Sequence, residues 1–215
     1  MGDRYAPAEI EPKWQARWDE SGINKSRESQ PGKLNWFALT MFPYPSGDVH
    51  IGHWFAFAPA DAHARFKKMQ GFNVLSPQGF DAFGLPAENA AIERGIHPRE
   101  WTYSNIENMR RQFRLMGNMY DWDREIVTCD PEYYRWNQLF FLRFYENDLA
   151  YRAEGLANWC ETDQTTIANE QVKDGLCERC GTVVVRRNMT QWFFRITKYA
   201  DELLQMDEIE WPDKI

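Results

Sequence analysis

Hydrophobic residues recur at helical spacing near the start of the chain. Within residues 5–21, the positions Ile10, Trp14 and Trp18 are four apart, which places them on one face of a helix. Gly22 follows this stretch and can adopt the left-handed conformation that ends many helices. The pattern therefore predicts an N-terminal helix with an aromatic face that ends at Gly22.

Strand, loop and helix patterns then alternate over the middle of the chain. A mostly apolar run over residues 34–42 is typical of a buried strand, and it ends at a proline-rich loop. In chain order, the pattern predicts a linker over 24–33, the strand over 34–42, a helix over 50–70, a second strand over 73–76, and helices over 86–95, 102–117 and from Asp130 onward. Thr102 and Asp130 are the expected N-caps of the last two helices. This alternation indicates an α/β domain with a parallel sheet.

Beyond residue 149 the pattern changes to short segments with high strand propensity. The expected elements are strands over 166–168, 182–185 and 192–194, and a helical segment over 199–206 that ends near Trp211 and Pro212. We therefore expect a small inserted β-rich module over residues 155–188.

Composition places the chain among globular proteins that bury a sizeable core. Of its 215 residues, 43% are hydrophobic and 15% are aromatic. The net charge of −7 argues against a face that binds phosphate backbones without sequence preference. The chain has no apolar run long enough to span a bilayer and no signal-peptide pattern, so we expect no membrane partner and a cytoplasmic location.

Four residues in the β-rich stretch have the spacing of a metal-binding ribbon. Cys177 and Cys180 form an intact Cys-x-x-Cys knuckle, whereas Cys160 is followed at the equivalent position by Asp163. Three thiolates and one carboxylate make structural Zn²⁺ a candidate cofactor. The alternative, a ribbon that keeps its shape without metal, stays open. The isolated Cys129 is interpreted as an ordinary small hydrophobic residue.

The strongest chemical signal is segment 43–53, between the first expected strand and the helix that follows it. Ligands bind open parallel sheets where the loops after strands enter helices. His50 and His53 are three residues apart, so they share one face of the first helical turn, whose free N–H groups favour an anion. Gly52 lets a base or phosphate approach the backbone. Two imidazoles here can donate hydrogen bonds to phosphate oxygens, and the alternative is that they only cap or pack.

The sequence His50-Ile51-Gly52-His53 matches the first signature of the class I aminoacyl-tRNA synthetases. Residues 41–47 and 79–91 resemble the leucyl branch of that family. The shorter matches are Trp101-Thr102, Tyr120-Asp121-Trp122, Gln191-Trp192-Phe193 and Tyr199-Ala200-Asp201. The resemblance thus covers nearly the whole chain. It implies an α/β fold, namely the first half of a Rossmann-like parallel-sheet nucleotide-binding domain with a small β-rich, zinc-ribbon-like insertion.

The resemblance also implies roles for individual residues. His50 and His53 would be catalytic, stabilising the transition state of adenylate formation, and the implied ATP-binding set is Pro43, Tyr44, His50, Gly52 and His53. Asp81 would anchor the α-amino group of leucine, and Phe42 and Tyr44 would form walls of its side-chain pocket.

These roles each have a structural alternative. Asp81 can instead cap a turn, and aromatic residues that flank a loop are often core residues. Gln78 and Phe80 depart from the methionine and tryptophan expected in the family, which leaves the packing around the pocket open.

The implied division of the chain has four parts. They are an N-terminal helical extension over 1–33, the first half of the catalytic domain with a helical insertion over 34–154, the zinc-ribbon-like module over 155–188, and a return segment over 189–215 that leads toward an editing domain. The lysine-rich second signature of the family does not occur in these residues, and Lys67-Lys68-Met69-Gln70 is a helix end. We therefore expect the chain alone to have little or no activity.

The resemblance implies an ATP-dependent leucine–tRNA ligase. Its partners would be leucine, ATP with Mg²⁺ and tRNA(Leu), and we expect a monomer. Two other enzyme classes stay open: another class I synthetase, for isoleucine, valine or methionine, and a nucleotidylyltransferase with the same paired histidines. A non-catalytic zinc-ribbon binding module is the alternative from a different class, and it would bind metal without affinity for ATP.

Overall fold

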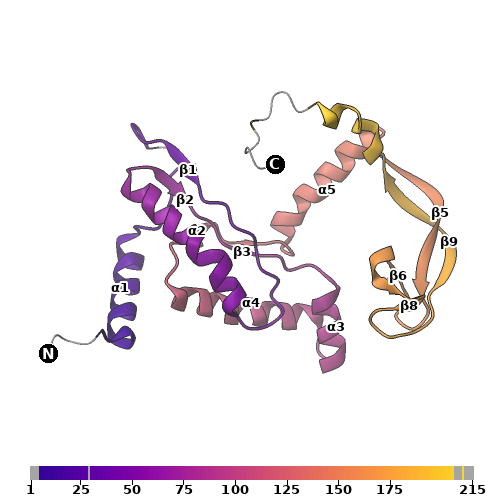
Figure 1. Ribbon diagram of the computed structural model, residues 1–215, viewed down its shortest axis with the longest axis horizontal. Helices are drawn as coiled ribbons and strands as arrows, with labels where there is room; N and C mark the ends of the chain where they lie inside the picture. Colours follow the sequence, from indigo (N-terminus) through magenta and orange to yellow (C-terminus); the bar gives the residue numbers. More distant parts are fainter. Residues whose placement is uncertain (1–4, 29, 206–209, 211–215) are drawn as a thin grey trace. The chain divides into compact units, whose positions relative to one another are not determined.

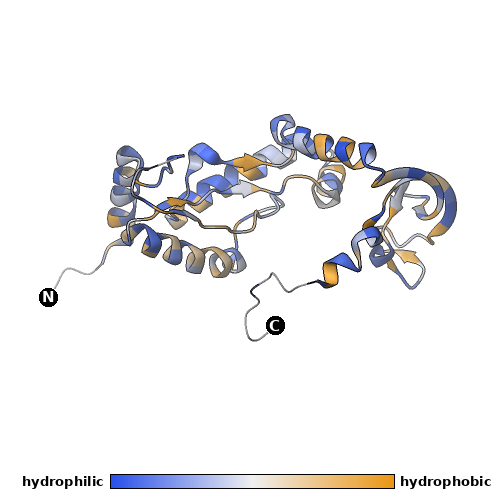
Figure 2. Cartoon of the chain, turned by 90° about the horizontal axis from the view of Figure 1, so that it is seen from above, coloured by the Kyte–Doolittle hydropathy of each residue, from blue (hydrophilic) through white to orange (hydrophobic). Residues whose placement is uncertain are grey.

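The computed structural model describes residues 5–28, 30–205 and 210. The chain divides into two compact units, Met1–Arg135 and Trp136–Ile215. Within the described residues, none of the helices combines the length and apolar character that a membrane span requires. Figure 1 gives the order of the elements along the chain, and Figure 2 shows hydrophobic and hydrophilic residues interspersed along the helices.

The first unit contains two pairs of short parallel strands connected by helices. Its elements are α1 (Pro7–Ser21), β1 (Asn35–Phe37), α2 (Ile51–Met69), β2 (Asn73–Leu75), β3 (Gly79–Phe80), α3 (Leu85–Arg94), α4 (Pro98–Met116), the 3₁₀ turn η1 (Trp122–Arg124) and β4 (Ile126–Val127). Strand β1 pairs with β2, and α2 connects these two strands along the chain. Strand β3 pairs with β4, and α3 and α4 connect them. Parallel pairing with helical crossovers confirms the α/β prediction.

An aromatic core joins α2, α4 and the strands. Phe57 of α2 and Phe80 of β3 are buried with Phe113 of α4, and the Phe57 and Phe113 rings meet edge to face at 5.4 Å. Ile106 and Met109 extend the same face of α4 at helical spacing. This core lies directly behind the first turn of α2, so it sets the position of that turn.

The segment between α1 and β1 is held to the rest of the first unit by two buried polar residues. Asn73 of β2 donates to the Arg27 carbonyl at 2.7 Å and accepts from Gln30 at 3.2 Å. Asp121 accepts two hydrogen bonds from Ser26, through N at 2.8 Å and Oγ at 2.7 Å. The predicted linker over 24–33 therefore has a fixed course along the first unit, although it forms neither helix nor strand among its described residues.

Several predicted boundaries in this unit are confirmed. Gly22, Gly95 and Gly117 end α1, α3 and α4 in the left-handed conformation, as expected. Asp130 directly precedes the helix predicted to follow it, and that helix begins at Pro131.

Two other predictions are wrong. The predicted strand over 34–42 is wrong in extent and burial, because only Asn35–Phe37 is strand and Phe37 is 56% exposed. The N-cap of α4 is His97, whose side chain accepts from Arg99 N, and Thr102 lies inside the helix.

The second unit is a β ribbon that follows a long helix. Its elements are most of α5 (Pro131–Glu146), which begins in the first unit, then β5 (Ala150–Cys160), β6 (Thr165–Ile167), η2 (Asn169–Gln171), β7 (Val172–Lys173), β8 (Leu176–Cys177), β9 (Val185–Phe194), η3 (Ile196–Tyr199) and η4 (Glu202–Leu204). Strands β5 and β9 pair antiparallel from Ala150↔Phe194 to Trp159↔Val185, and β6 covers the other edge of β5.

The structure modifies the predicted elements of this unit. The strand predicted over 166–168 is observed at Thr165–Ile167, and the one predicted over 192–194 is part of the longer β9. The strand predicted over 182–185 is wrong: β9 begins only at Val185, and Val183 forms an isolated bridge to Leu176. The paired strands of the β ribbon run from Ala150 to Phe194. The β structure therefore begins before residue 155 and ends after residue 188, the two limits of the predicted module. The segment 199–206 forms short 3₁₀ turns rather than a helix as far as residue 205, and the predicted end at Trp211 and Pro212 lies outside the described residues.

Candidate functional site

The two histidines of segment 43–53 lie together in the first turn of α2. His50 is the N-cap, and its Nδ1 accepts from Gly52 N at 3.1 Å. His53 Nδ1 accepts in return from His50 N at 3.1 Å, and the two ring centroids are 4.0 Å apart. His50 is exposed and His53 is partly buried, so capping the helix leaves both rings beside solvent.

Gly52 keeps the His50 ring in place by having no side chain. A Cβ atom at position 52 would lie 2.9 Å from His50 Cε1 and 3.0 Å from His50 Nδ1, both too close for a normal contact. A larger residue would therefore displace the ring and break its hydrogen bond from the Gly52 amide. The glycine was predicted to permit close ligand approach, and the structure adds this second reason for it.

His53 is held between the solvent and the aromatic core. Its ring stacks on Phe57 with centroids 6.1 Å apart and meets Phe113 edge to face at 6.2 Å. Burial, together with the nearby His50, lowers the pKa of His53 below its usual value. The neutral imidazole is therefore favoured at neutral pH.

The loops after β1 and β3 meet beside this turn. The amide of Asp81 donates to the carbonyl of Pro43 at 3.0 Å, which ties the two loops together through their backbones. Gly79 permits the approach, since a Cβ there would lie 2.5 Å from the Ile126 carbonyl and 3.0 Å from the Phe42 ring. The structure thus brings the candidate residues Phe42, Pro43 and Asp81 together, although they come from two separate loops.

The polar and aromatic groups of these loops differ in exposure. The Asp81 carboxylate is partly exposed and makes no hydrogen bond or ion pair to the described residues, so it is free to receive a cationic group. Tyr44 is 60% exposed, whereas Phe42 is partly buried and Pro43 is buried. Gln78 and Phe80, the two departures from the family pattern, are fully buried. The side-chain amide of Gln78 has no hydrogen-bond partner among the described residues.

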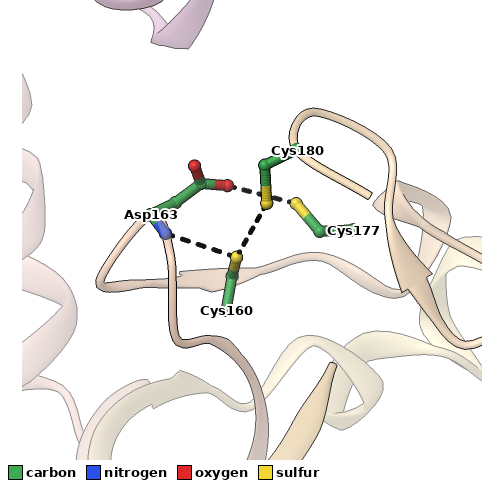
Figure 3. Close-up of side chains that lie close together, drawn as sticks. All are labelled: Cys160, Asp163, Cys177 and Cys180. Carbon is green, nitrogen blue, oxygen red and sulfur yellow. Dashed lines mark hydrogen bonds between the residues drawn. The ribbon is translucent and has the colours of Figure 1, made fainter. Parts of the chain in front are cut away.

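The four predicted metal ligands of the second unit gather at one point. The ligand atoms of Cys160, Asp163, Cys177 and Cys180 all lie within 4.8 Å of one another (Figure 3). Cys160 Sγ lies 3.3 Å from Cys180 Sγ, and Cys177 Sγ lies 3.2 Å from Asp163 Oδ2. Ligands around tetrahedral zinc are separated by roughly 3.8 Å, given Zn–S bonds of about 2.3 Å. The residues present therefore fit a zinc ion without a large rearrangement.

The environment of this cluster favours the anionic form of two of the four candidate ligands, Asp163 and Cys180. A hydrogen bond from Cys177 lowers the pKa of the Asp163 carboxyl, and hydrogen bonds from Thr182 lower that of Cys180. The backbone N–H of Asp163 lowers the pKa of Cys160. Burial and the adjacent Cys180 and Asp163 side chains outweigh this effect and raise the pKa of Cys160 to about 11.

The same cysteines have a packing role. Cys160 and Cys177 are buried and pack with Ile167, so the cluster also forms the small core of the ribbon. Cys129, in the first unit, lies apart from it in sequence and packs against the aromatic core.

Sequence reasoning missed one group of residues near the histidines. Asn108 and Gln112 of α4 hydrogen-bond to Asp48 and Val49, directly before His50. Only Asp48 and Val49 lie in the motif that the sequence singled out, and pattern reasoning gives no signal for a pairing across some sixty residues.

Comparison with known proteins relates this arrangement to a family. The model of the family described as tRNA synthetases class I (I, L, M and V) matches residues 13–214. The chain is 61% identical over 213 residues to the leucine–tRNA ligase of Rubrobacter xylanophilus. This match covers 98% of the chain and 26% of that relative. It is 53% identical over 218 residues to the leucine–tRNA ligase subunit alpha of Aquifex aeolicus, covering 100% of the chain and 34% of that subunit. The chain thus spans about a quarter to a third of the length of these relatives.

Solved structures agree with the sequence matches. The ternary complex of Agrobacterium radiobacter K84 LeuRS with tRNA and LeuAMS has a TM-score of 0.83 and 41% identity, over 94% of this chain and 26% of that chain. Mycobacterium tuberculosis methionyl-tRNA synthetase in complex with methionyl-adenylate has a TM-score of 0.64 and 24% identity, over 80% of this chain and 34% of that chain. At that identity the second likeness shows the fold alone.

Proposed function

Because the chain belongs to the class I tRNA synthetases (I, L, M and V), we propose that it carries the first half of the adenylate-forming site of a leucine–tRNA ligase. The observation that carries this proposal is the pair of solvent-facing imidazoles, His50 and His53, fixed at the N-terminus of α2. The choice of leucine is supported by the leucine–tRNA ligase relatives at 53–61% identity. The whole reaction also needs the segments that these longer relatives possess.

The hydrogen bonds within the first turn determine which ring nitrogens can donate. Each Nδ1 accepts a backbone N–H, His50 from Gly52 and His53 from His50. A neutral imidazole that accepts at Nδ1 carries its proton on Nε2. Both histidines therefore have an Nε2–H group for the oxygens of bound ATP, in addition to the positive end of the helix dipole.

The proposed reaction is attack on ATP by the leucine carboxylate. A carboxylate oxygen bonds to the α-phosphorus as the bond to pyrophosphate breaks, which yields leucyl-adenylate and pyrophosphate. The Nε2–H groups of His50 and His53 would stabilise the charge that grows on the phosphate oxygens. Gly52 and the Pro43–Tyr44 loop would admit the nucleotide, and Mg²⁺ would accompany it on the phosphates.

Leucine would bind between the two loops that meet at Pro43 and Asp81. The free carboxylate of Asp81 would pair with the α-amino group, which also positions the attacking carboxylate. Phe42 and Tyr44 would contact the apolar side chain, Phe42 as a fixed wall against Gly79 and Tyr44 as an exposed one.

The remaining assignments are also proposals. We propose that Cys160, Asp163, Cys177 and Cys180 hold a structural zinc ion, which would fix the turns of the ribbon to one another. The division into 1–33, 34–154, 155–188 and 189–215, the cytoplasmic location, the monomeric state and tRNA(Leu) as acceptor all stay predictions.

The test is leucine-dependent ATP–pyrophosphate exchange in a chimera. This chain replaces the matching segment of the Rubrobacter xylanophilus relative, which supplies the rest of a full-length enzyme. We expect exchange with leucine and much less with isoleucine, valine or methionine, and little exchange by the chain alone. His50→Ala and His53→Ala should each lower the exchange rate constant. A chimera that folds but exchanges with none of these amino acids would exclude the proposal.

A further inference from the structure

The residues directly before His50 are held by hydrogen bonds from α4. Gln112 Oε1 accepts from Val49 N at 2.7 Å, and Gln112 Nε2 donates to Asp48 Oδ1 at 2.8 Å. Asn108 Nδ2 donates to the same Asp48 oxygen at 2.6 Å. Gln112 thus uses both ends of its amide on two successive residues, so a single side chain fixes the backbone and the side chain of this loop.

Further contacts restrict the same residues. The Val49 side chain packs against the aromatic core, next to which Gln112 is partly buried on α4. Arg111 Nη2 donates to Asn108 Oδ1 at 3.0 Å, which orients the Asn108 amide so that its Nδ2 faces Asp48. The loop is therefore held at Val49 by both packing and hydrogen bonding.

The position of these hydrogen bonds argues against an incidental surface contact, because they hold the residue directly before the N-cap of α2. An N-terminal helix turn offers its free N–H groups to a ligand, and the angle at which the chain enters the helix sets where those groups point. Here Val49, which leads into the helix, is bound to a neighbouring helix whose Phe113 also contacts His53. Helix α4 thus supports the turn from two sides, through Gln112 before His50 and through Phe113 behind His53.

We propose that Gln112 is a positioning residue for adenylate formation, supported by Asn108 through their shared contact with Asp48. By holding Val49, Gln112 fixes the N-cap His50 and directs its Nε2–H toward the phosphates. This inference rests on the proposed function of the site. A misplacement of about 1 Å in such a site can lower a rate roughly 100-fold, so a distant hydrogen bond suffices to affect the reaction.

The chimera tests this inference with the substitution Gln112→Glu. Glutamate still accepts from Val49 N, but its second oxygen faces the ionised Asp48 and repels it. We expect kcat for leucine-dependent exchange to fall roughly 10- to 100-fold while the KM for leucine changes little, since Asp81 is untouched. Gln138→Glu is the matched control, because it makes the same chemical change at an exposed position of α5.

A second substitution, at Asp48, again gives the side chain at position 112 a hydrogen-bond donor in place of a repelling carboxylate. In the double variant Asp48→Asn with Gln112→Glu, the new asparagine can accept from Asn108 and donate to the new glutamate. We expect the double variant to recover most of the lost kcat, and Asp48→Asn alone to be mild because its oxygen still accepts both amides. A role in folding alone would change the unfolding midpoint in parallel with activity, whereas repositioning changes kcat at a constant midpoint. If Gln112→Glu does not fold, Asn108→Ala is the variant to measure. It removes only one donor to Asp48, so we expect a smaller fall in kcat than for Gln112→Glu.

The outcomes separate this inference from the function on which it rests. An unsubstituted chimera without leucine-dependent exchange overturns both. An active chimera whose Gln112→Glu variant keeps its kcat overturns the positioning role alone, and so does a double variant that recovers nothing. If Gln112→Glu does not fold, an Asn108→Ala variant with unchanged kcat overturns it equally.

Discussion

Position 52 and position 79 are two places beside the site where a side chain would collide with its neighbours. At Gly52 the obstacle is the ring of His50, and at Gly79 it is the Ile126 carbonyl and the Phe42 ring. Neither glycine has the positive φ angle that would otherwise demand this residue. Their small size, rather than backbone freedom, is what the site uses.

The substitution Gly52→Ala tests this directly. The added methyl must push the His50 ring from its place on the Gly52 amide, so we expect exchange by the chimera to fall roughly 100-fold. Alanine favours helix over glycine by about as much free energy as the lost cap hydrogen bond contributes, so the unfolding midpoint should change little. Loss of exchange without loss of stability is the expected pair of results, and full exchange would show that the reaction tolerates a displaced His50.

The titration of His53 gives a pH-dependent test on the chain itself. The pKa of His53 should lie below the 6.5 of an unperturbed histidine, measured from its ring protons by NMR, because burial disfavours the charged ring. Since folding lowers this pKa, the contribution of His53 to stability is complete above the unfolded value and is lost as pH falls from there through the folded value. His50→Gln should raise the pKa of His53 only in part, because burial is the larger cause. A midpoint at or above 6.5 would contradict the observed environment.

At the scale of elements, local signals in the sequence predicted the helices better than the strands. Gly22 and Gly117 marked helix ends correctly because a left-handed cap is decided by one residue. Thr102 was wrong as an N-cap because Pro98 occupies the first turn of α4 and His97 supplies the cap. These two residues together outweighed the preference of an isolated threonine for that position.

The strands of the second unit show why the rest could not be predicted. Strand β5 alternates weakly between polar and apolar residues, and it is defined by its pairing with β9 from Ala150↔Phe194 onward. The same limit applies to the site. The motif identified His50 and His53 from local spacing, whereas the contact of Gln112 with Val49 depends on how α4 packs against α2.

The ribbon of the second unit provides a test by metal removal. We expect the purified chain to bind zinc, and Cys177→Ser to lower its occupancy while Cys129→Ser leaves it unchanged. Replacing Asp163 by cysteine should tighten binding in competition with a chelator, because thiolate is the softer ligand. The measurements are metal analysis and absorption of the cobalt-substituted protein. A chain that binds no zinc yet keeps an intact ribbon would support the metal-free alternative.

At the scale of the whole molecule, the two proposed sites lie in different compact units. The histidines, the loops after β1 and β3 and the residues of α4 that contact them all belong to Met1–Arg135, and the four candidate zinc ligands all belong to Trp136–Ile215. The proposed nucleotide site and the proposed zinc site can therefore each be changed by substitutions within a single unit.

The pairing of β3 with β4 has a consequence for the order in which the chain folds during its synthesis. The last hydrogen-bond partner that the loops after β1 and β3 use among the described residues is Thr128, whose hydroxyl accepts from the amide of Ala82 at 2.8 Å. The contacts described above for the two histidines and Asp81 are therefore all available once that residue has left the ribosome. Because domains generally fold in the order in which they are made, this turn and its two loops can assemble while the ribbon is still being translated.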